Sequence, residues 1–397
     1  MAPYLHGPDS ELKNTLKAVS RISQFESIPK TFYFIDGNRS NTKKIGNDIS
    51  DVEKALTSNN FNCPTSDLNS MIEQALLKVP HETSILVTDA LYDLGRLPGD
   101  EKCLINKPCI RLQGLTDDLN NIINKKLRSS NFQTIILKAE SSFKGPYYFA
   151  TKPGKCSVNL NQNRPYYYFI FGSEGLLENT ELKHKIENIS NVNEVIKLNK
   201  NDKGNNIRYE IAGYSRINKT RGTYRKCRGD DHCIEDVKIS DSKGFDFSVK
   251  VDFSDFDWME NLITSPSSYK FNNDLYQLKD DDSVPFDVIS EVEDTEYTHQ
   301  ITVSTDTWNV YDNSLKIYIP KCTLPSWVQS SGCKEGGKCS DQDIQRKCCH
   351  NSCYYDEISI KGDQERTWGI NSIINAISKS YCDHNDHLFE LNFEIKR

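Results

Sequence analysis

Thr31-Phe-Tyr-Phe-Ile-Asp36 is an apolar run that ends in an acidic residue. Ser84-Ile-Leu-Val-Thr-Asp89 repeats this arrangement further along the chain. Short and nearly continuous apolar runs are typical of strands that are buried on both faces of a sheet. The two runs therefore predict two buried strands, each with a carboxylate at its carboxyl end.

Segments with helical patterns separate these strands from two more apolar runs. Alternation of strands and helices favours right-handed crossovers, and so predicts an open, mostly parallel α/β sheet with helices on both faces. Ligand sites in such sheets lie at the carboxyl ends of strands, where Asp36 and Asp89 are expected. The predicted helices are 47–56, 66–78, 115–127 and 178–189, and the further strands are 132–138 and 166–172.

The pattern changes after about residue 203, where strand-like segments alternate with acidic and Asn/Ser/Pro-rich loops. A helix over 368–381 and an alternating strand over 388–396 are expected at the end of the chain. We therefore predict two domains, an α/β domain over 1–203 and a β-rich, cysteine-rich domain over 204–397. The expected strands of the second domain include 207–212, 245–253, 286–292, 297–305 and 315–319.

Composition argues against two classes of protein. The net charge of −7 argues against a nucleic-acid-binding protein, which usually carries a basic excess. No run reaches the ~18 apolar residues that a membrane-spanning helix needs. The first residues have neither the basic nor the apolar region of a signal peptide, which leaves the compartment open.

The 13 cysteines include three pairs with the same separation. Each pair encloses a polar or turn-forming segment, which suits a small loop closed by a disulfide. Disulfides would place the protein in the periplasm or outside the cell, although unpaired buried thiols remain an alternative. The predicted pairs are Cys103–Cys109, Cys227–Cys233 and Cys333–Cys339.

Zinc is the other interpretation of the cysteines near the C-terminus. Cys333, Cys339, Cys348, Cys349, His350 and Cys353 offer enough ligands for a structural zinc site. The C-x₂-C pairs that make a zinc signature specific are missing. The odd count leaves at least one thiol unpaired within a monomer, and the pattern assigns no partners to Cys63, Cys156, Cys322, Cys348, Cys349, Cys353 and Cys382.

Phe34-Ile-Asp36-Gly-Asn38-Arg-Ser40, with the downstream Ile85-Leu-Val-Thr-Asp89-Ala90, resembles the von Willebrand factor A family. The resemblance covers residues 30 to 200 and extends, through other segments, to bacterial proteins with this N-terminal fold. It implies a metal-ion-dependent adhesion site, in which oxygen ligands hold Mg²⁺ and leave a position for a partner's carboxylate. The implied ligands are Asp36, Asn38, Ser40 and Asp89.

The sequence departs from the family pattern at several positions. Asn38 replaces a serine, Ala90 replaces the usual glycine, and the metal-contacting threonine is not identifiable. Arg39 offers a positive charge that would occupy the site in place of a metal. The resemblance therefore implies a degenerate site, either with bound Mg²⁺ or without metal.

Arg228-Gly229-Asp230 lies between Cys227 and Cys233. A closed loop would hold its guanidinium and carboxylate at a fixed spacing, as in integrin-binding ligands, but a match of three residues also arises often by chance. The resemblance to the von Willebrand factor A family, and not this tripeptide, implies the expected function: a non-enzymatic binding or interaction protein that contacts a protein or surface ligand through the degenerate adhesion site. Two alternatives stay open: a metal-dependent hydrolase that uses Asp36 and Asp89, and a bacterial effector or defence component.

Overall fold

The computed structural model describes much of the chain, with gaps. At a few of the described positions, among them Cys333 and Cys339, only the backbone is described. The described residues are 2–5, 10–21, 30–35, 42–56, 67–91, 107–148, 157–173, 185–186, 188–189, 191–200, 207–212, 221–239, 244–279, 296–307, 314–321, 323–329, 333–334, 338–339, 367, 369–382 and 387–396.

The chain forms two compact units, and neither is one continuous segment. The first unit contains Met1–Lys200 and Ser326–Tyr381, and the second contains Asn201–Pro325 and Cys382–Arg397. The sequence analysis placed everything after residue 203 in one domain, whereas the structure assigns Ser326–Tyr381 to the first unit. No helix in the described part of the chain is long and apolar enough to cross a membrane.

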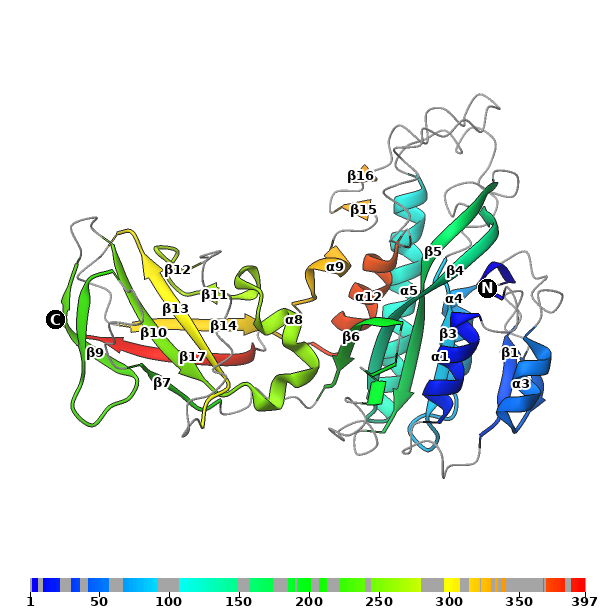
Figure 1. The fold of residues 1–397 in the computed structure, drawn as a ribbon, viewed down its shortest axis with the longest axis horizontal. Helices are drawn as coiled ribbons and strands as arrows, with labels where there is room; N and C mark the ends of the chain where they lie inside the picture. The colour runs from blue at the N-terminus through cyan, green and yellow to red at the C-terminus, as the bar shows by residue number, and fades with distance from the viewer. Residues whose placement is uncertain are drawn as a thin grey trace. The chain divides into compact units, whose positions relative to one another are not determined.

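A four-stranded antiparallel sheet forms the centre of the first unit (Figure 1). Its order is β3 (Ser84–Thr88), β5 (Ser157–Gly172), β4 (Gln133–Tyr148) and β6 (Val192–Leu198). All three neighbouring pairs run antiparallel. The predicted open, mostly parallel α/β sheet is therefore wrong, and the described structure has more strand than helix.

The long strand β4 explains why the prediction failed. β4 continues ten residues beyond the predicted 132–138 segment, and β5 returns beside it in register from Gln133↔Gly172 to Tyr148↔Ser157. Ala139, Ser141, Phe143 and Tyr147 are buried, whereas most residues between them are not. This alternation is that of a strand with one covered face, and antiparallel neighbours need no helical crossover.

β1 (Phe32–Ile35) does not belong to this sheet. It pairs antiparallel with β2 (Thr42–Gly46) in a separate two-stranded sheet. The two apolar runs that end in Asp36 and Asp89 are thus not neighbouring strands. The expected alignment of their carboxyl ends at one sheet edge is wrong.

Three helices of the first unit, α1, α3 and α4, begin at polar caps. Ser10, Asp48 and Asp67 each accept a hydrogen bond from a backbone N–H in the first turn of the following helix. The helix predicted over 66–78 is confirmed, with Asp67 rather than Ser66 as its cap. The elements are η1 (Ala2–Tyr4), α1 (Glu11–Ser20), α3 (Ile49–Ala55), α4 (Leu68–Leu76), α5 (Lys107–Ser129), α9 (Ser326–Gln329) and α12 (Ile370–Lys379).

α12 joins the first unit by packing beside α5 (Figure 1). Asn120 on α5 donates from Nδ2 to Ala376 O and to Ser380 Oγ, both at 2.8 Å. Gly369 precedes α12 with φ of 81°, and a Cβ added there would lie 2.9 Å from Leu112 Cδ2. A glycine is needed at this position because the backbone is left-handed and α5 passes close to it.

The second unit consists of two sheets that enclose a shared core. One has the order β12-β13-β10-β7 and the other β11-β14-β17-β9-β8. β7, β10, β13, β14 and β17 lie where the sequence analysis predicted strands, and among the described strands β9 and β17 form the one parallel pair. The strands are β7 (Tyr209–Ile211), β8 (Thr223–Lys226), β9 (Cys233–Lys238), β10 (Phe245–Val251), β11 (Lys270–Phe271), β12 (Tyr276–Leu278), β13 (His299–Thr305), β14 (Ser314–Pro320) and β17 (His387–Ile395).

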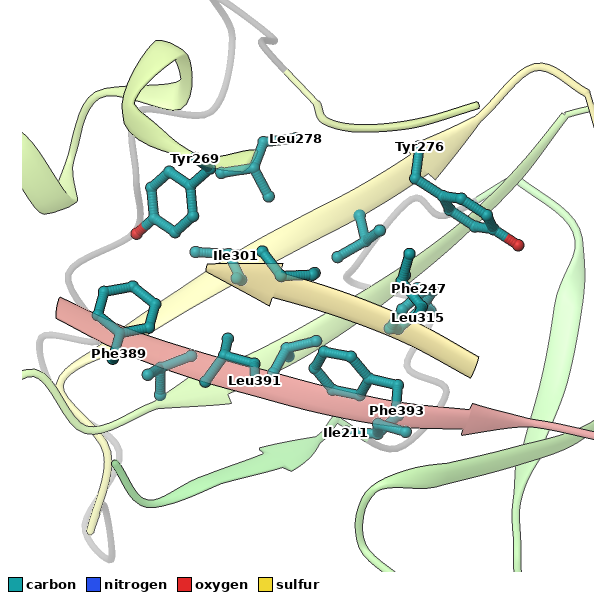
Figure 2. Close-up of a cluster of buried hydrophobic side chains, with 14 of the residues drawn as sticks. Ile211, Phe247, Tyr269, Tyr276, Leu278, Ile301, Leu315, Phe389, Leu391 and Phe393 are labelled. Carbon is teal, nitrogen blue, oxygen red and sulfur yellow. The ribbon is translucent and has the colours of Figure 1, made fainter. Parts of the chain in front are cut away.

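The core between these sheets is rich in aromatic side chains (Figure 2). Alternate residues of β17 point into it, among them Phe389, Leu391 and Phe393. Three short helical segments, η5 (Ser254–Met259), α8 (Glu260–Ile263) and η6 (Pro266–Ser268), connect β10 to β11 and contribute buried apolar side chains. The alternation of apolar and polar residues along β17 therefore corresponds to one buried face, as predicted.

β10 is buried on both faces, and its second face carries a charge. The side chain of Asp246 has no exposed surface. Arg221 donates to Asp246 Oδ1 from Nε at 3.0 Å and from Nη2 at 2.9 Å, and Ser304 Oγ donates to the same oxygen at 2.9 Å. Lys279 Nζ lies 3.6 Å from Oδ2. The enclosed carboxylate thus has both hydrogen-bond donors and positive charges around it, as buried charges require.

Buried tyrosines predict an alkaline transition of the first unit. Burial raises the pKa of Tyr166 to about 12, and it also raises the pKa of Tyr4 and Tyr168. In the unfolded chain tyrosine ionises near pH 10. The free energy of unfolding of the first unit therefore has its full value below pH 10 and falls as the pH rises to about 12. Ionisation of Tyr166 alone accounts for about 2–3 kcal/mol of that loss.

Tyrosinate absorbance and far-ultraviolet circular dichroism, followed from pH 9 to 12.5, measure this transition. We expect ionisation of the buried tyrosines to coincide with loss of structure. The Tyr166→Phe variant, which cannot ionise at this position, should unfold at a higher pH than the unmodified protein. An unchanged midpoint in this variant would contradict the assignment.

Candidate functional site

The predicted metal ligands are only partly placed by the structure. Asp36, Asn38 and Ser40 lie outside the described residues, so the structure does not define their distances from Asp89. Asp89 directly follows β3, as predicted. With three of the four oxygen ligands outside the described residues, a bound Mg²⁺ stays a prediction.

Asp89 forms part of a tight turn at the end of β3. Its Oδ1 accepts from Leu91 N at 3.4 Å, and Thr88 Oγ1 accepts from Ala90 N at 3.1 Å. Ala90 has φ of 54°, in the left-handed region that a non-glycine residue rarely adopts. Thr367 Oγ1 donates to Asp89 O at 3.4 Å. The surrounding contacts hold this turn in a conformation that costs energy, a feature that often accompanies functional sites.

A buried arginine lies near this turn. Arg164 on β5 is 2% exposed, and its guanidinium lies 3.9 Å from the ring centroid of Tyr147. Tyr4 donates from its hydroxyl to Pro165 O at 2.7 Å. Burial raises the pKa of Tyr4, the negative charge of Asp89 raises it further, and the positive charge of Arg164 opposes both.

The hydroxyl of Tyr4 is protonated at neutral pH, because its pKa is raised above the ordinary tyrosine value near 10. A protonated tyrosine donates hydrogen bonds and does not act as a base or nucleophile. The cluster of Tyr4, Tyr147, Arg164 and Asp89 is suited to attaching the N-terminal segment to the sheet.

The disulfide predicted between Cys227 and Cys233 is confirmed, with a Cα–Cα distance of 5.3 Å. Cys382 is also disulfide-bonded, although the sequence pattern assigned it no partner. Cys103 lies outside the described residues. Cys109 lies in α5, where only its backbone is described. The pairing of Cys103 with Cys109 therefore stays a prediction.

The third predicted pair is supported by the backbone alone. β15 (Cys333–Lys334) and β16 (Lys338–Cys339) form a two-stranded antiparallel sheet in which Cys333 is directly opposite Cys339. Directly opposite residues of such a pair bring their Cβ atoms within about 5.5 Å, close to the distance that a disulfide spans. The side chains are not described, so this disulfide also stays a prediction.

The residues from Cys227 to Cys233, here named the Cys227 loop, join β8 to β9 in the second unit. The backbone closes on itself, because Cys227 N donates to Cys233 O at 3.0 Å. Gly229 has φ of 78°, and a Cβ added to it would meet no atom within 4 Å. Asp230 Oδ1 accepts from His232 N at 2.9 Å. The loop therefore has a defined turn with open space over its glycine.

The second half of the loop is packed against the sheets. His232 stacks on Tyr209 with ring centroids 4.1 Å apart, and its Nε2 lies 2.9 Å from Tyr209 O. Asp231 pairs with Lys226 at 2.9 Å, and this contact lowers the pKa of its carboxyl. Asp231 O accepts from Ile211 N at 2.8 Å. These contacts fix one side of the loop and leave Arg228 and Gly229 exposed.

Asp230, Cys233 and Glu394 each place one ligand-type atom within 4.8 Å of the others. The sulfur of Cys233 is bonded to that of Cys227, so it is not a thiolate that could bind a metal. Glu394 pairs with Lys396 at 3.1 Å. What remains is a pair of neighbouring carboxylates beside the exposed part of the loop.

No family model, no curated protein and no solved structure matches this chain. The functional argument therefore depends on the geometry of the described residues.

Sequence reasoning found Asp89 and the Cys227 loop but missed their surroundings. The buried Arg164 has a weak signal, since a lone arginine precedes the apolar run 165–171. Glu394 and Tyr209 give no signal, because each is far in sequence from the loop that it contacts. Their contribution depends on strand pairing, which the sequence pattern did not predict.

Proposed function

We propose that this chain is a binding protein that presents the Cys227 loop to a partner protein outside the cytoplasm. The observation that carries the proposal is the disulfide-closed loop with Arg228 and Gly229 exposed. A loop whose shape is fixed before binding loses less conformational entropy when it binds. The disulfide favours an oxidising compartment, since such bonds are rare in the cytosol.

The contacts of the loop support a role in presentation. The loop is attached through its second half to Tyr209 and Lys226, whereas Arg228 and Gly229 are exposed. Arg228 is exposed, and the space where a Cβ of Gly229 would stand is empty. Neither residue takes part in the attachment, so both are suited to contact with another protein.

The proposal is tested by adhesion of cultured cells to surfaces coated with the protein. We expect the Cys227→Ser/Cys233→Ser double variant to retain at least tenfold fewer cells, because the opened loop no longer holds its shape. The Asp274→Asn variant is the control, since Asp274 is an exposed residue of another turn of the second unit. Equal adhesion to the double variant and the unmodified protein, or none to either, would overturn the proposal.

A further inference from the structure

We infer that two copies of this chain associate through the outer edge of β5, over residues 159–163. The inference is independent of the Cys227 loop, because β5 belongs to the first unit. Two observations carry it: this edge of β5 presents unpaired backbone groups, and the sequence of the segment matches a second copy of itself.

The ribbon of β4 and β5 is longer than the strands that flank it (Figure 1). β3 pairs with β5 only as far as Tyr167, so among the described strands β4 is the one neighbour of β5 over residues 157–165. β3 ends there, at the turn that contains Asp89 and Ala90. The edge of β5 is therefore not continued by β3.

Three asparagines of β5 direct their backbone groups away from β4. Glu140 is opposite Pro165, yet its N–H donates to Asn191 O at 3.0 Å, beside β6. Opposite residues that do not bond to each other direct their groups outward, and every second antiparallel pair is of this kind. Pro165 O accordingly accepts from the hydroxyl of Tyr4 at 2.7 Å. The residues at every second position before Pro165 face the same edge, and no hydrogen bond joins their outward groups to a described residue. These residues are Asn159, Asn161 and Asn163.

The outer edge of β4, by contrast, is protected over the same stretch. Ser142 N donates to Glu11 Oε2 at 2.7 Å, Lys144 is exposed, and Pro146 has no N–H to donate. Covering side chains, lysine and proline all hinder the pairing of a sheet edge with another chain. Residues 159–163 contain no proline and no charged side chain. Of the two edges, that of β5 is the one suited to accept another strand.

The backbone of this edge specifies the chemistry of its partner. N–H and C=O groups that alternate at strand spacing bind an extended polypeptide. Residues that direct both groups outward exchange two hydrogen bonds with the residue opposite. An antiparallel strand would therefore be held by all three asparagines, and the ladder would end at Pro165, whose oxygen already bonds to Tyr4.

The side chains favour a second copy of the chain as that strand. A two-fold axis at Asn161 places this residue opposite its own copy and Asn159 opposite Asn163 of the second copy. All three side chains are exposed. An amide has both a donor and an acceptor, so an asparagine can hydrogen-bond to another asparagine, and no like charges oppose each other in this register. The segment therefore matches itself in both backbone and side chains.

Sedimentation velocity of the full chain, from about 5 to about 500 µM, tests the association. We expect a monomer at the lowest concentration and mostly dimer at the highest, because three residue pairs bury less than the roughly 1,200 Å² of stable complexes. Non-reducing gels of the same samples should show no covalent dimer. A monomer at every concentration, which would leave the edge to some other extended segment, would overturn the inference, and so would a dimer joined by a disulfide.

Proline substitutions compare the two edges of the ribbon. Asn161→Pro removes an outward N–H and leaves the bonds to β4 in place, so we expect at least tenfold weaker dimerisation. Lys144→Pro is the matched control, because Lys144 is directly opposite Asn161 and its N–H faces the other edge; dimerisation should stay within twofold. Circular dichroism verifies that both variants fold. Equal effects of the two substitutions would contradict the assignment to β5.

A pair of charged variants tests the register without proline. Asn159→Lys/Asn163→Lys and Asn159→Asp/Asn163→Asp each place like charges opposite each other across the two-fold axis, so neither variant alone should form dimers. An equimolar mixture places lysine opposite aspartate at both positions and should dimerise at least as strongly as the unmodified protein. Dimers of either variant alone, or a mixture that stays monomeric, would overturn the inference.

Discussion

Replacing Phe389 with alanine is expected to lower the free energy of unfolding of the second unit by about 3–5 kcal/mol, the usual cost of removing a large aromatic side chain from a core. Phe389 is 1% exposed. Its ring contacts Phe253, Phe256 and Tyr269, with centroids 5.2, 5.6 and 5.9 Å away. Its loss would leave a cavity where β17 meets the segment that follows β10.

Hydrogen–deuterium exchange of peptides from β10 and β17, measured by mass spectrometry, would detect this loss. We expect faster exchange throughout the second unit, because its two sheets share one core. The Phe389→Leu variant is the control, since it keeps most of the apolar volume and should cost clearly less. If both variants exchange at the rate of the unmodified protein, Phe389 does not support the core as described.

The Arg221→Met variant is expected to lower the free energy of unfolding by about 3 kcal/mol, because breaking a buried pair leaves an uncompensated charge. Arg221 provides two of the hydrogen bonds to Asp246, whose side chain has no exposed surface. Lys279 remains nearby at 3.6 Å and keeps the loss at the lower end of the usual range. Urea denaturation measures the change.

A neighbouring carboxylate gives the matched control for this prediction. Asp306 also pairs with Arg221, at 2.6 Å, but its side chain is 73% exposed. Exposed ion pairs contribute about 0–1 kcal/mol, so Asp306→Asn should change stability by less than about 1 kcal/mol. A similar loss in Asp306→Asn and Arg221→Met would mean that burial of Asp246 is not the cause.

Much of the second unit could be predicted from periodicity. β10, β13, β14 and β17 lie in segments whose apolar residues recur at alternate positions or in short β-branched and aromatic runs. The first unit was predicted less well. β4 contains Gly145 and Pro146, residues that usually interrupt a strand, and yet they pair with β5 in continuous register. Local composition there predicts a break, whereas pairing with β5 maintains the strand.

The candidate site was also predicted only in part from the sequence. The spacing of Cys227 and Cys233 and the polar residues between them were enough to predict the disulfide, because a short closed loop depends on local geometry. The stacking of Tyr209 on His232 and the approach of Glu394 to Asp230 join strands that are distant in sequence. No local pattern carries that information.

The sequence by itself determined where most strands and several helices lie, and that a disulfide closes the loop around Arg228-Gly229-Asp230. Only the tertiary structure decided how the strands pair, which residues assemble each unit, and which side chains surround that loop. Periodicity reports which face of an element is buried, and this depends on neighbours a few residues apart. The direction and partner of a strand depend on contacts between distant segments, so an apolar run like 84–88 fits a parallel or an antiparallel sheet equally well.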